Sequence, residues 1–518
     1  MSGPSHNNVS RYVVNASSSI ATAIIRMSAL VWVNQYLLRR IEPAEYALVP
    51  VVASLLIVAE LFPTVFLRGL ARFMVEADAR RDGRDMTSIV SSMVPVLFTV
   101  ALVLFIAGVL AVIHIDRVIT VDPQYRTQAQ AMLLMLVSVL CIRVAATPFR
   151  LGLHVRMRFV EQNLILLGTE TLRIVLLLVL LLAVSTQVLW VAVASSVANL
   201  VNMLILIGYT FNVLPDARLR LSAISFSTIQ RLLSFSLWTL FQGLNNLVLK
   251  AVPALLLNRN SSAIDVASFH IGSLADTQIR KLVVAAAAPA KPALTTIYAT
   301  EGESTLQSLY YHGGRYFLWV TLFLLPPLLV FAYPLIMLYA GDKYNLAAPV
   351  MLLLLGVYPL IWASGMFYEI AYAVGRIRAY NVCIMVLSLS ALTGMWYFVV
   401  VHNMGALGAA IALSGAYVLV YPLLMWPIGL WLVRGKWSTF LLKTLFPGLG
   451  PFAAACLGCL IFSKVFPIDG WGKFFLGCGL SSLVYVGVLF TMCINQNDRE
   501  LLVRARRKIG NQLKRSRK

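Results

Sequence analysis

Charged residues are scarce in this sequence, and acidic residues are the scarcest. Only 12% of the 518 residues are charged, with 21 Asp and Glu against 42 Lys and Arg, whereas 60% are hydrophobic and the mean hydropathy is +0.82. A soluble globular protein of this length does not need so much apolar surface. The composition therefore excludes the soluble classes of enzyme and binding protein.

Motifs that carry chemistry are missing as well. The sequence contains no G-x-x-x-x-G-K-[ST] phosphate-binding loop, no cluster of metal ligands and no nucleophile elbow. We therefore expect no catalytic role, no metal site, no resident cofactor and no ATP-driven transport by this chain alone. Cys456 and Cys459 have the spacing of a redox motif, but they lie in a predicted membrane helix, where packing between helices explains small residues better.

Long apolar runs predict an all-α integral membrane protein. A helix needs about 20 apolar residues to cross roughly 30 Å of hydrocarbon, and many runs here have that length. The strict alternation of a membrane β-barrel is missing. Fourteen spans fit best, although twelve would give the same parity. The predicted cores are 12–38, 44–67, 88–113, 128–148, 163–184, 188–210, 232–257, 264–296, 315–339, 346–373, 380–401, 405–433, 440–463 and 473–494.

Basic residues give these spans an orientation. Lys and Arg concentrate on the side that holds the N-terminus and in the tail after Asn495, and cytoplasmic loops collect such residues. We therefore expect both termini in the cytoplasm. The formal charge of +21 follows from this topology and does not indicate nucleic acid. The tail is expected to be either a surface helix on lipid headgroups or a disordered, solvated segment.

A near-constant offset of about 223 residues suggests an internal duplication. It relates three pairs of landmarks, which are Arg26 with Lys250, Tyr46 with Phe269, and Arg68 with Lys291. With an even number of spans in each copy, the two copies form parallel repeats about a pseudo-two-fold axis along the membrane normal. The predicted units are a six-helix N-lobe (1–210), a cytoplasmic linker (211–231), a six-helix C-lobe (232–433), two further helices (434–494) and a basic tail (495–518).

Cations inside the predicted spans are the main candidates for a binding site. Lipid makes ionisable groups costly, so those that persist usually face protein or a water-filled cavity. Arg26 lies deep in the first span, and Arg280 and Lys281 lie in the eighth. Lys250 lies nearer the end of the seventh span, where its side chain can also extend to the membrane surface. We predict that these cations line a cavity for an anion, with a structural ion pair as the alternative.

Acidic residues in the spans are candidates for ion coupling. Glu60 and Glu369 lie on otherwise apolar helices, and Asp276 lies beside the predicted cavity cations. A carboxylate kept from water can carry a proton at neutral pH. Each has a structural alternative, because Glu60 and Glu369 can neutralise Arg26 or Arg143, and Asp276 can pair with the arginine four positions later.

Three stretches resemble polysaccharide exporters of the multidrug/oligosaccharidyl-lipid/polysaccharide superfamily. Residues 39–46 (RRIEPAEY) resemble the turn after their first helix, 338–348 (LYAGDKYNLAA) the outer turn between their ninth and tenth, and 405–412 (GALGAAIA) the start of their twelfth. The resemblance implies a V-shaped pair of six-helix lobes, alternating access, and export of a lipid-linked oligosaccharide across the bacterial inner membrane.

The same resemblance implies a substrate site and partners. Basic residues of the central cavity in that family are thought to meet the pyrophosphate of the substrate, and Arg26, Lys250 and Arg280 match them here. The implied partners are the lipid-linked oligosaccharide, membrane lipids, and a polysaccharide polymerase with other export machinery. Coupling to H⁺ or Na⁺ is left open.

Relatives in the same superfamily are the alternatives. Lipid II flippases also have fourteen helices and a cationic cavity, but residues 17–30 (SSSIATAIIRMSAL) lack their Ser-Arg-Val-Leu-Gly pattern. Multidrug extrusion proteins usually have twelve helices and expel cations, which a basic cavity repels. A membrane glycosyltransferase or polymerase fits less well, because no loop between the spans is long enough to carry a catalytic site.

Overall fold

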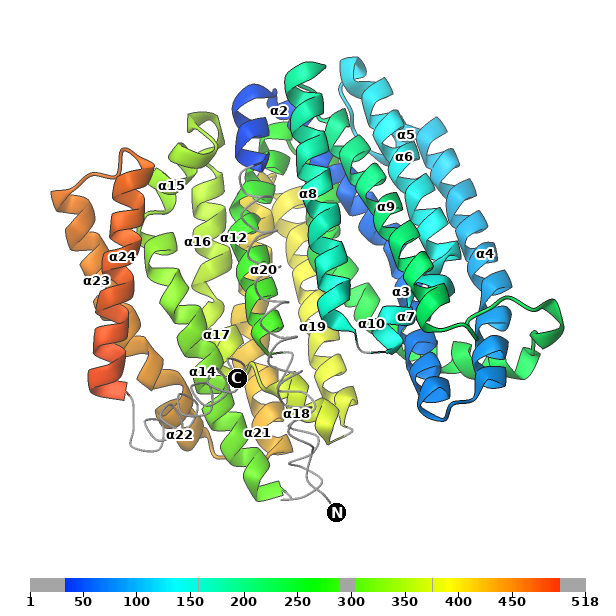
Figure 1. Ribbon diagram of the computed structural model, residues 1–518. Coiled ribbons are helices and arrows are strands. Elements are labelled where there is room, and N and C mark those ends of the chain that lie inside the picture. The colour runs from blue at the N-terminus through cyan, green and yellow to red at the C-terminus, as the bar shows by residue number, and fades with distance from the viewer. Residues whose placement is uncertain (1–32, 157, 288–302, 375, 494–518) are drawn as a thin grey trace, which may run out of the picture.

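Helices make up all the regular structure that can be described. The computed structural model describes residues 33–156, 158–287, 303–374 and 376–493, and all the secondary structure in these ranges is helical (Figure 1). The predicted all-α fold class is therefore confirmed. Arg26 and the basic tail lie outside the described residues, so the predictions for them stay predictions.

The first half of the chain forms the N-lobe, here residues 33–213. Its second long helix is capped by Asp82, the residue before its first turn. The Asp82 carboxylate accepts hydrogen bonds from the backbone N–H groups of Arg84 (3.1 Å) and Asp85 (3.0 Å), as N-cap residues commonly do. The elements in order are α2 (Pro43–Tyr46), α3 (Leu48–Ala79), α4 (Gly83–Ile113), α5 (Ile115–Val118), η1 (Pro123–Tyr125), α6 (Arg126–Ala145), η2 (Thr147–Arg150), α7 (Gly152–Val155), α8 (Phe159–Ala183) and α9 (Leu189–Val213).

The second half forms the C-lobe and a helix pair beside it. The linker contains η3 (Leu221–Ala223), and the elements after it are α10 (Phe226–Lys250), α11 (Val252–Asn260), α12 (Ala263–Ala287), α14 (Glu303–Val330), α15 (Ala332–Tyr339), η4 (Asp342–Tyr344), α16 (Ala347–Gly356), α17 (Tyr358–Ala363), α18 (Phe367–Ala373), α19 (Ile377–Met395), η5 (Trp396–Val401), α20 (Gly405–Val420), η6 (Tyr421–Met425), α21 (Trp426–Leu432), α22 (Trp437–Phe440), η7 (Leu441–Leu445), α23 (Phe446–Val465), α24 (Trp471–Val488) and η8 (Leu489–Cys493). Pro253 and Pro359 lie in the first turns of α11 and α17, where they interrupt longer helices because proline has no N–H to donate.

Ten helical stretches among the described residues are long and apolar enough to cross a membrane, so the chain is a multi-pass membrane protein. They are Pro43–Leu61, Gly83–Ile113, Pro123–Ala145, Phe159–Ala183, Leu189–Val213, Leu306–Val330, Ile377–Val401, Gly405–Leu432, Trp437–Val465 and Trp471–Cys493. The predicted span 12–38 lies mostly outside the described residues, 232–257 is divided between α10 and α11, and 346–373 is divided among α16, α17 and α18. The count of fourteen therefore stays a prediction.

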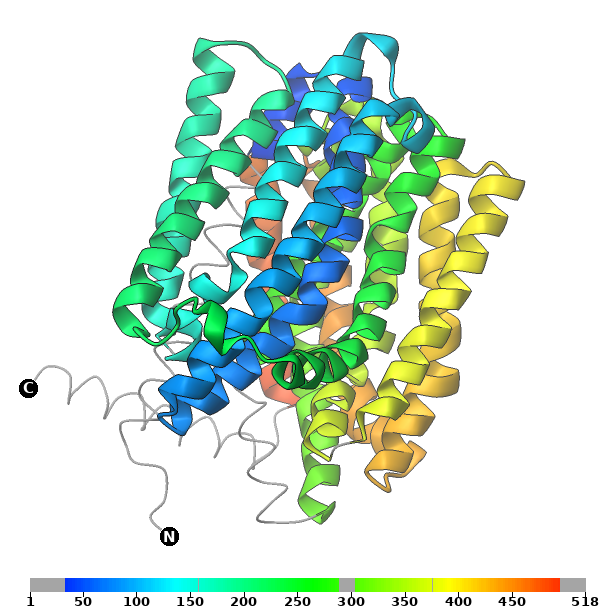
Figure 2. The same cartoon turned by 90° about the vertical axis from the view of Figure 1, so that its right-hand side faces the viewer.

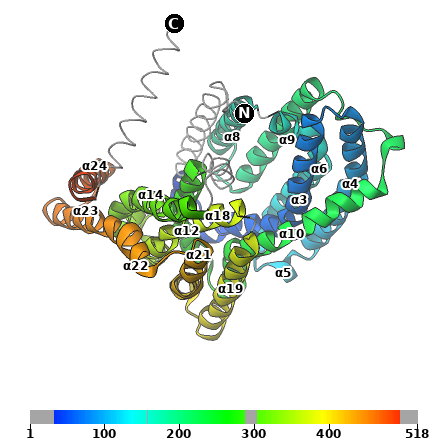
Figure 3. The ribbon, with the colours of Figure 1, turned by 90° about the horizontal axis from the view of Figure 1, so that it is seen from below.

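The helices pack as two lobes with a crossing helix between them (Figure 1). In the N-lobe α4 packs on α6 and α8 packs on α9; in the C-lobe α12, α16 and α20 pack together. Helix α10 packs along α3 and then reaches α19, so it crosses from one lobe to the other (Figure 3). The last two helices, α23 and α24, pack on each other and on α14 at the edge of the C-lobe.

The molecule has two distinct ends. The outer end holds α2, α5 and the turns α11–α12, α15–α16 and α23–α24, and the inner end holds the α3–α4 turn, α7, α18 and α22 (Figure 1). The positive-inside rule predicts that the inner end faces the cytoplasm.

Candidate functional site

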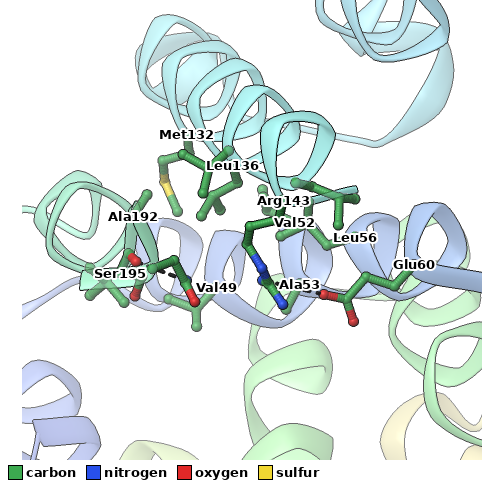
Figure 4. A pocket seen from close by; sticks show the side chains of 14 residues that line it. Val49, Val52, Ala53, Leu56, Glu60, Met132, Leu136, Arg143, Ala192 and Ser195 are labelled. Carbon is green, nitrogen blue, oxygen red and sulfur yellow. Dashed lines mark hydrogen bonds and ion pairs between the residues drawn. The ribbon is translucent and has the colours of Figure 1, made fainter. Parts of the chain in front are cut away.

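A cavity of about 250 Å³ lies inside the N-lobe, between α3, α6 and α9 (Figure 4). Most of its lining is apolar, but Glu60 of α3, Arg143 of α6, and Ser195 and Asn199 of α9 give it a polar side. The Asn199 amide donates to the backbone carbonyl of Ser195 at 2.8 Å, which fixes its orientation. An apolar pocket with a few convergent polar groups is the usual form of a ligand site. We call it the N-lobe cavity.

Charged residues lie at and near the polar side of the N-lobe cavity. Arg143 points towards Glu60 (Figure 4), with 3.9 Å between the guanidinium nitrogen and the carboxylate oxygen, and the Glu60 side chain is 50% exposed. Arg150 lies nearby in η2. Burial and the positive charge of Arg143 lower the pKa of Arg150 to about 10 despite the opposing effect of Glu60, so Arg150 stays protonated at neutral pH. Arg143 and Arg150 therefore both bring positive charge to this region, which suits an anion.

A second cluster lies inside the C-lobe, between α12, α17 and α20, and we call it the C-lobe cluster. Arg280 Nε donates to Asp276 Oδ1 at 2.7 Å. The Tyr358 hydroxyl donates to the same oxygen at 2.8 Å and is 2.9 Å from the Asp276 carbonyl. The Arg280 guanidinium carbon lies 5.4 Å from the ring centre of Tyr358 and 5.2 Å from that of Tyr417, within the range of cation–π contacts. Arg280 is thus held by groups on three helices, and its ion pair with Asp276 is present.

The remaining predicted site residues are distributed over other elements. Lys250 is exposed at the last position of α10, and Lys281 is exposed on α12. Glu369 is buried in α18, with 8% of its surface exposed. The convergence of these cations on one cavity stays a prediction, because Arg26 lies outside the described residues. So do the coupling roles predicted for the three carboxylates.

The outer ends of the two lobes touch each other. The Asn258 side chain of α11 donates to the Thr120 carbonyl at 2.9 Å and accepts from the Thr120 N–H at 2.8 Å. The Arg39 guanidinium donates to the backbone carbonyl of Leu338, which Gln35 also contacts at 3.3 Å. We call these bonds the outer contact. They join residues before 121 to residues after 257, so they close the outer end of the molecule between the lobes.

The three stretches that carry the family resemblance all lie at this outer end. Arg39 and Leu338 belong to two of them and bond to each other. Gly405 of the third has a φ of 51°, a conformation that favours glycine, and the next residue, Ala406, donates its N–H to Asp265 Oδ1 at 3.0 Å. These stretches therefore connect the lobes or start a helix.

The sequence analysis missed several residues of the N-lobe cavity region and of the C-lobe cluster. It named Arg143 only as a partner for Glu60 or Glu369, and it did not predict Arg150, Tyr358 or Tyr417 as site residues. An arginine near the end of a span looks like an interface anchor, and a tyrosine in an apolar helix is common, so neither gives a specific signal. Within the described residues no three His, Cys, Asp or Glu side chains gather as a metal site requires, so what these clusters offer is charge and hydrogen bonds.

Comparisons with known proteins agree with this architecture. Residues 14–295 match the family model described as polysaccharide biosynthesis protein. No curated protein sequence matches. Among solved structures, the lipid II flippase MurJ in an inward closed conformation shares 11% identity at a TM-score of 0.68, covering 92% of this chain and 98% of that one.

Two multidrug-type structures are also similar. An inward-facing multidrug resistance MATE family transporter of the MOP superfamily is 13% identical at a TM-score of 0.64, covering 81% of this chain and 98% of its own. A MOP superfamily transporter from Pyrococcus furiosus is 13% identical at a TM-score of 0.60, covering 83% and 96%. At such identities these structures establish a shared fold, that of MOP superfamily transporters. Because the family model spans more than half of the sequence, the chain belongs to the polysaccharide biosynthesis protein family.

Proposed function

We propose that the protein is a flippase that moves a polyprenyl-pyrophosphate-linked oligosaccharide across the bacterial inner membrane, for exopolysaccharide or O-antigen assembly. Membership of the polysaccharide biosynthesis family supports the substrate class. The fold shared with a lipid II flippase supports transport of a lipid-linked substrate across the membrane. The observation that carries the proposal is a transporter fold that keeps partly buried arginines inside both lobes.

The physical task is to move a pyrophosphate through a region without water. An unpaired charge in a low-dielectric medium is prohibitively costly, so the head group needs fixed cations along its path. Arginine suits this role because it donates two parallel hydrogen bonds to phosphate oxygens, whereas lysine offers a point charge. We propose that Arg26, Lys250, Arg280 and Lys281 bind the pyrophosphate while the polyprenyl chain stays in lipid, and that the N-lobe cavity contributes further positive charge.

Release on the far side requires the outer contact to open. We propose alternating access, in which the structure described here is a state with the outer ends joined. Glu60, Asp276 and Glu369 are the proposed sites for a coupling H⁺ or Na⁺ that resets the cavity after release. Both termini are proposed to lie in the cytoplasm, and a polysaccharide polymerase is the proposed downstream partner.

Deletion of the gene followed by analysis of membrane lipids tests the proposal. A lipid-linked repeat unit should accumulate on the cytoplasmic side, and surface polysaccharide should fall. Normal surface polysaccharide in the deletion strain would overturn it. Re-expression of the intact chain is the control, because it should remove the accumulated intermediate.

A lipid II flippase is the second candidate, and the TM-score of 0.68 to MurJ favours it. Complementation separates the two functions. The chain should fail to support growth of cells depleted of their own lipid II flippase if its substrate is the polysaccharide precursor. Rescue of those cells would transfer the assignment to lipid II. Lost drug resistance with intact polysaccharide in the deletion strain would instead indicate multidrug efflux.

A further inference from the structure

An exposed apolar strip lies at the inner end of the N-lobe. The linker between α9 and α10 leaves Leu219, Leu221 and Ile224 exposed, and α10 begins with Phe226 exposed. Leu221 and Phe226 expose 77% and 79% of their surface. Such large side chains would lose several kcal/mol of favourable burial if they faced water, at about 25 cal/mol per Å². Large exposed apolar side chains gathered in one short segment indicate an interaction surface.

The strip lies at the foot of a helix that faces lipid. Of the most apolar 18-residue stretch of α4, only 11% is buried inside the protein, the smallest share among the ten described spans. Figure 2 shows the linker crossing the inner ends of α3 and α4. The exposed apolar surface of α4 begins at Phe98, less than two helical turns beyond the buried Ser91 and Ser92. The linker therefore lies near the inner boundary of the lipid-facing surface of α4, where we place the boundary between hydrocarbon and headgroups.

Hydrogen bonds from α4 hold the linker in this position. The Thr87 hydroxyl donates to the Asp216 carbonyl at 2.9 Å. The Ser91 hydroxyl accepts from the Arg220 N–H at 2.9 Å, and the hydroxyl of the neighbouring Ser92 accepts from the Ser225 N–H at 2.9 Å. Ser91 and Ser92 are both fully buried. The linker is thus bound to the N-lobe along its length.

An open basic cleft lies between the linker and the α3–α4 turn, with a volume of about 870 Å³. Four arginines and two aspartates supply its charge, so the lining is net positive. Its residues are Arg80, Arg81, Asp82, Gly83, Arg84, Thr87, Asp216, Arg220, Ser222 and Ala223. We call it the linker cleft.

Three of the arginines have charges that the protein does not use for itself. Arg80 is 2.7 Å from Asp85, whereas within the described residues Arg81, Arg84 and Arg220 make no ion pair. Arg84 lies in the first turn of α4, where the helix dipole favours anions and a cation weakens the helix. Helix stability therefore does not explain Arg84, and its charge is available to an external anion.

We propose that the linker cleft binds the phosphate of an anionic phospholipid while the apolar strip inserts among the acyl chains beside it. Interfacial segments combine these two features, apolar side chains below the headgroups and arginines at the phosphate level. Lipid binding anchors the linker and, through it, the start of the crossing helix α10. The proposal is independent of the exported substrate.

Dye labelling tests the insertion. Leu221→Cys, in a chain without its six native cysteines, carries an environment-sensitive dye and is reconstituted in vesicles of phosphatidylcholine with or without phosphatidylglycerol. Brominated acyl chains should quench the dye at position 221 and spare a matched label at Lys343→Cys, in an exposed outer turn. Equal quenching at both positions, or none at 221, would overturn the insertion.

Titration with short-chain phosphatidylglycerol in detergent tests the cleft. Arg84→Gln and Arg220→Gln should each weaken lipid binding about fivefold, as expected for one interfacial charge, whereas Arg117→Gln at the outer end should not. Both targets are exposed, so their melting temperatures without lipid should match the unmodified protein. Unchanged lipid affinity in the Arg84→Gln and Arg220→Gln double variant would overturn the site. Displacement of the lipid by low concentrations of soluble pyrophosphate would overturn the assignment to phospholipid.

Discussion

Two carboxylates inside the lobes differ in their distance from an arginine and in their exposure. Asp276 lies 2.7 Å from Arg280 and also accepts a hydrogen bond from Tyr358. Glu60 lies 3.9 Å from Arg143 and is half exposed to the N-lobe cavity. The first pair is fixed by its surroundings and supports the C-lobe, whereas the second leaves its carboxylate accessible. Of these two proposed coupling residues, Glu60 therefore has the geometry better suited to exchanging an ion.

Asp276→Asn should destabilise the protein by about 1–3 kcal/mol, because it leaves the Arg280 guanidinium partly buried without its anion. The double variant with Arg280→Gln should recover part of this loss. Thermal unfolding of the two single variants and the double variant measures the coupling. Asp469→Asn is the matched control, since Asp469 also pairs with a cation four residues later but is exposed, and it should change stability little. Additive losses in the double variant would contradict a stabilising pair.

Glu60→Gln should make export independent of an imposed proton gradient, because an amide cannot take up and release a proton. Export into vesicles at different gradients measures this effect. Glu76→Gln is the control, because Glu76 lies on the same helix and is also paired with an arginine, at 4.0 Å, but outside the cavity. An unchanged gradient dependence in Glu60→Gln would remove Glu60 from the coupling mechanism.

At the scale of elements, hydrogen bonds from short connections at the outer end add to the packing of α10, α11 and α12 on the N-lobe. Helix α11 is only nine residues long, yet its Asn258 forms two of the hydrogen bonds of the outer contact. The polar contact is easier to open than a packed apolar interface, because water can replace each bond at little net cost. An element joined in this way suits a transporter that alternates between two states.

Asn258→Ala should shift the protein towards a state with the outer ends apart. Loss of two hydrogen bonds, worth about 1–3 kcal/mol together, corresponds to a shift of roughly 5- to 150-fold in the equilibrium. Spin labels at Arg117 and Lys343 report the distance between the outer ends. Asn260→Ala is the control. Asn260 lies on the same helix, and its side-chain amide donates to the Leu256 carbonyl of that helix at 2.9 Å and not to the N-lobe. Identical distance distributions in the two variants would contradict the role of the outer contact.

At the scale of the whole molecule, hydropathy predicted the architecture, but it did not predict how side chains pair. Apolar runs identified the all-α membrane fold, because a span needs a minimum length of apolar sequence. The structure divides the predicted spans 232–257 and 346–373 into shorter helices, with Pro253 and Pro359 at two of the breaks. The i,i+4 pair in α12 was predictable from spacing alone. The Asn258–Thr120 bonds were not, since residues 138 positions apart share no local pattern.

A final prediction concerns the orientation of the molecule in the membrane. Arginines gather around the linker cleft at the inner end, so positive charge should keep this end in the cytoplasm. In intact cells, a membrane-impermeant maleimide should label cysteines placed at Lys343 and Lys464, in exposed outer positions, and should not label Ser222→Cys in the linker until the cells are opened. A chain without native cysteines is the background, and labelling after permeabilisation confirms that each site is reactive. Labelling of position 222 in intact cells would reverse the orientation and, with it, the direction in which the proposed substrate is exported.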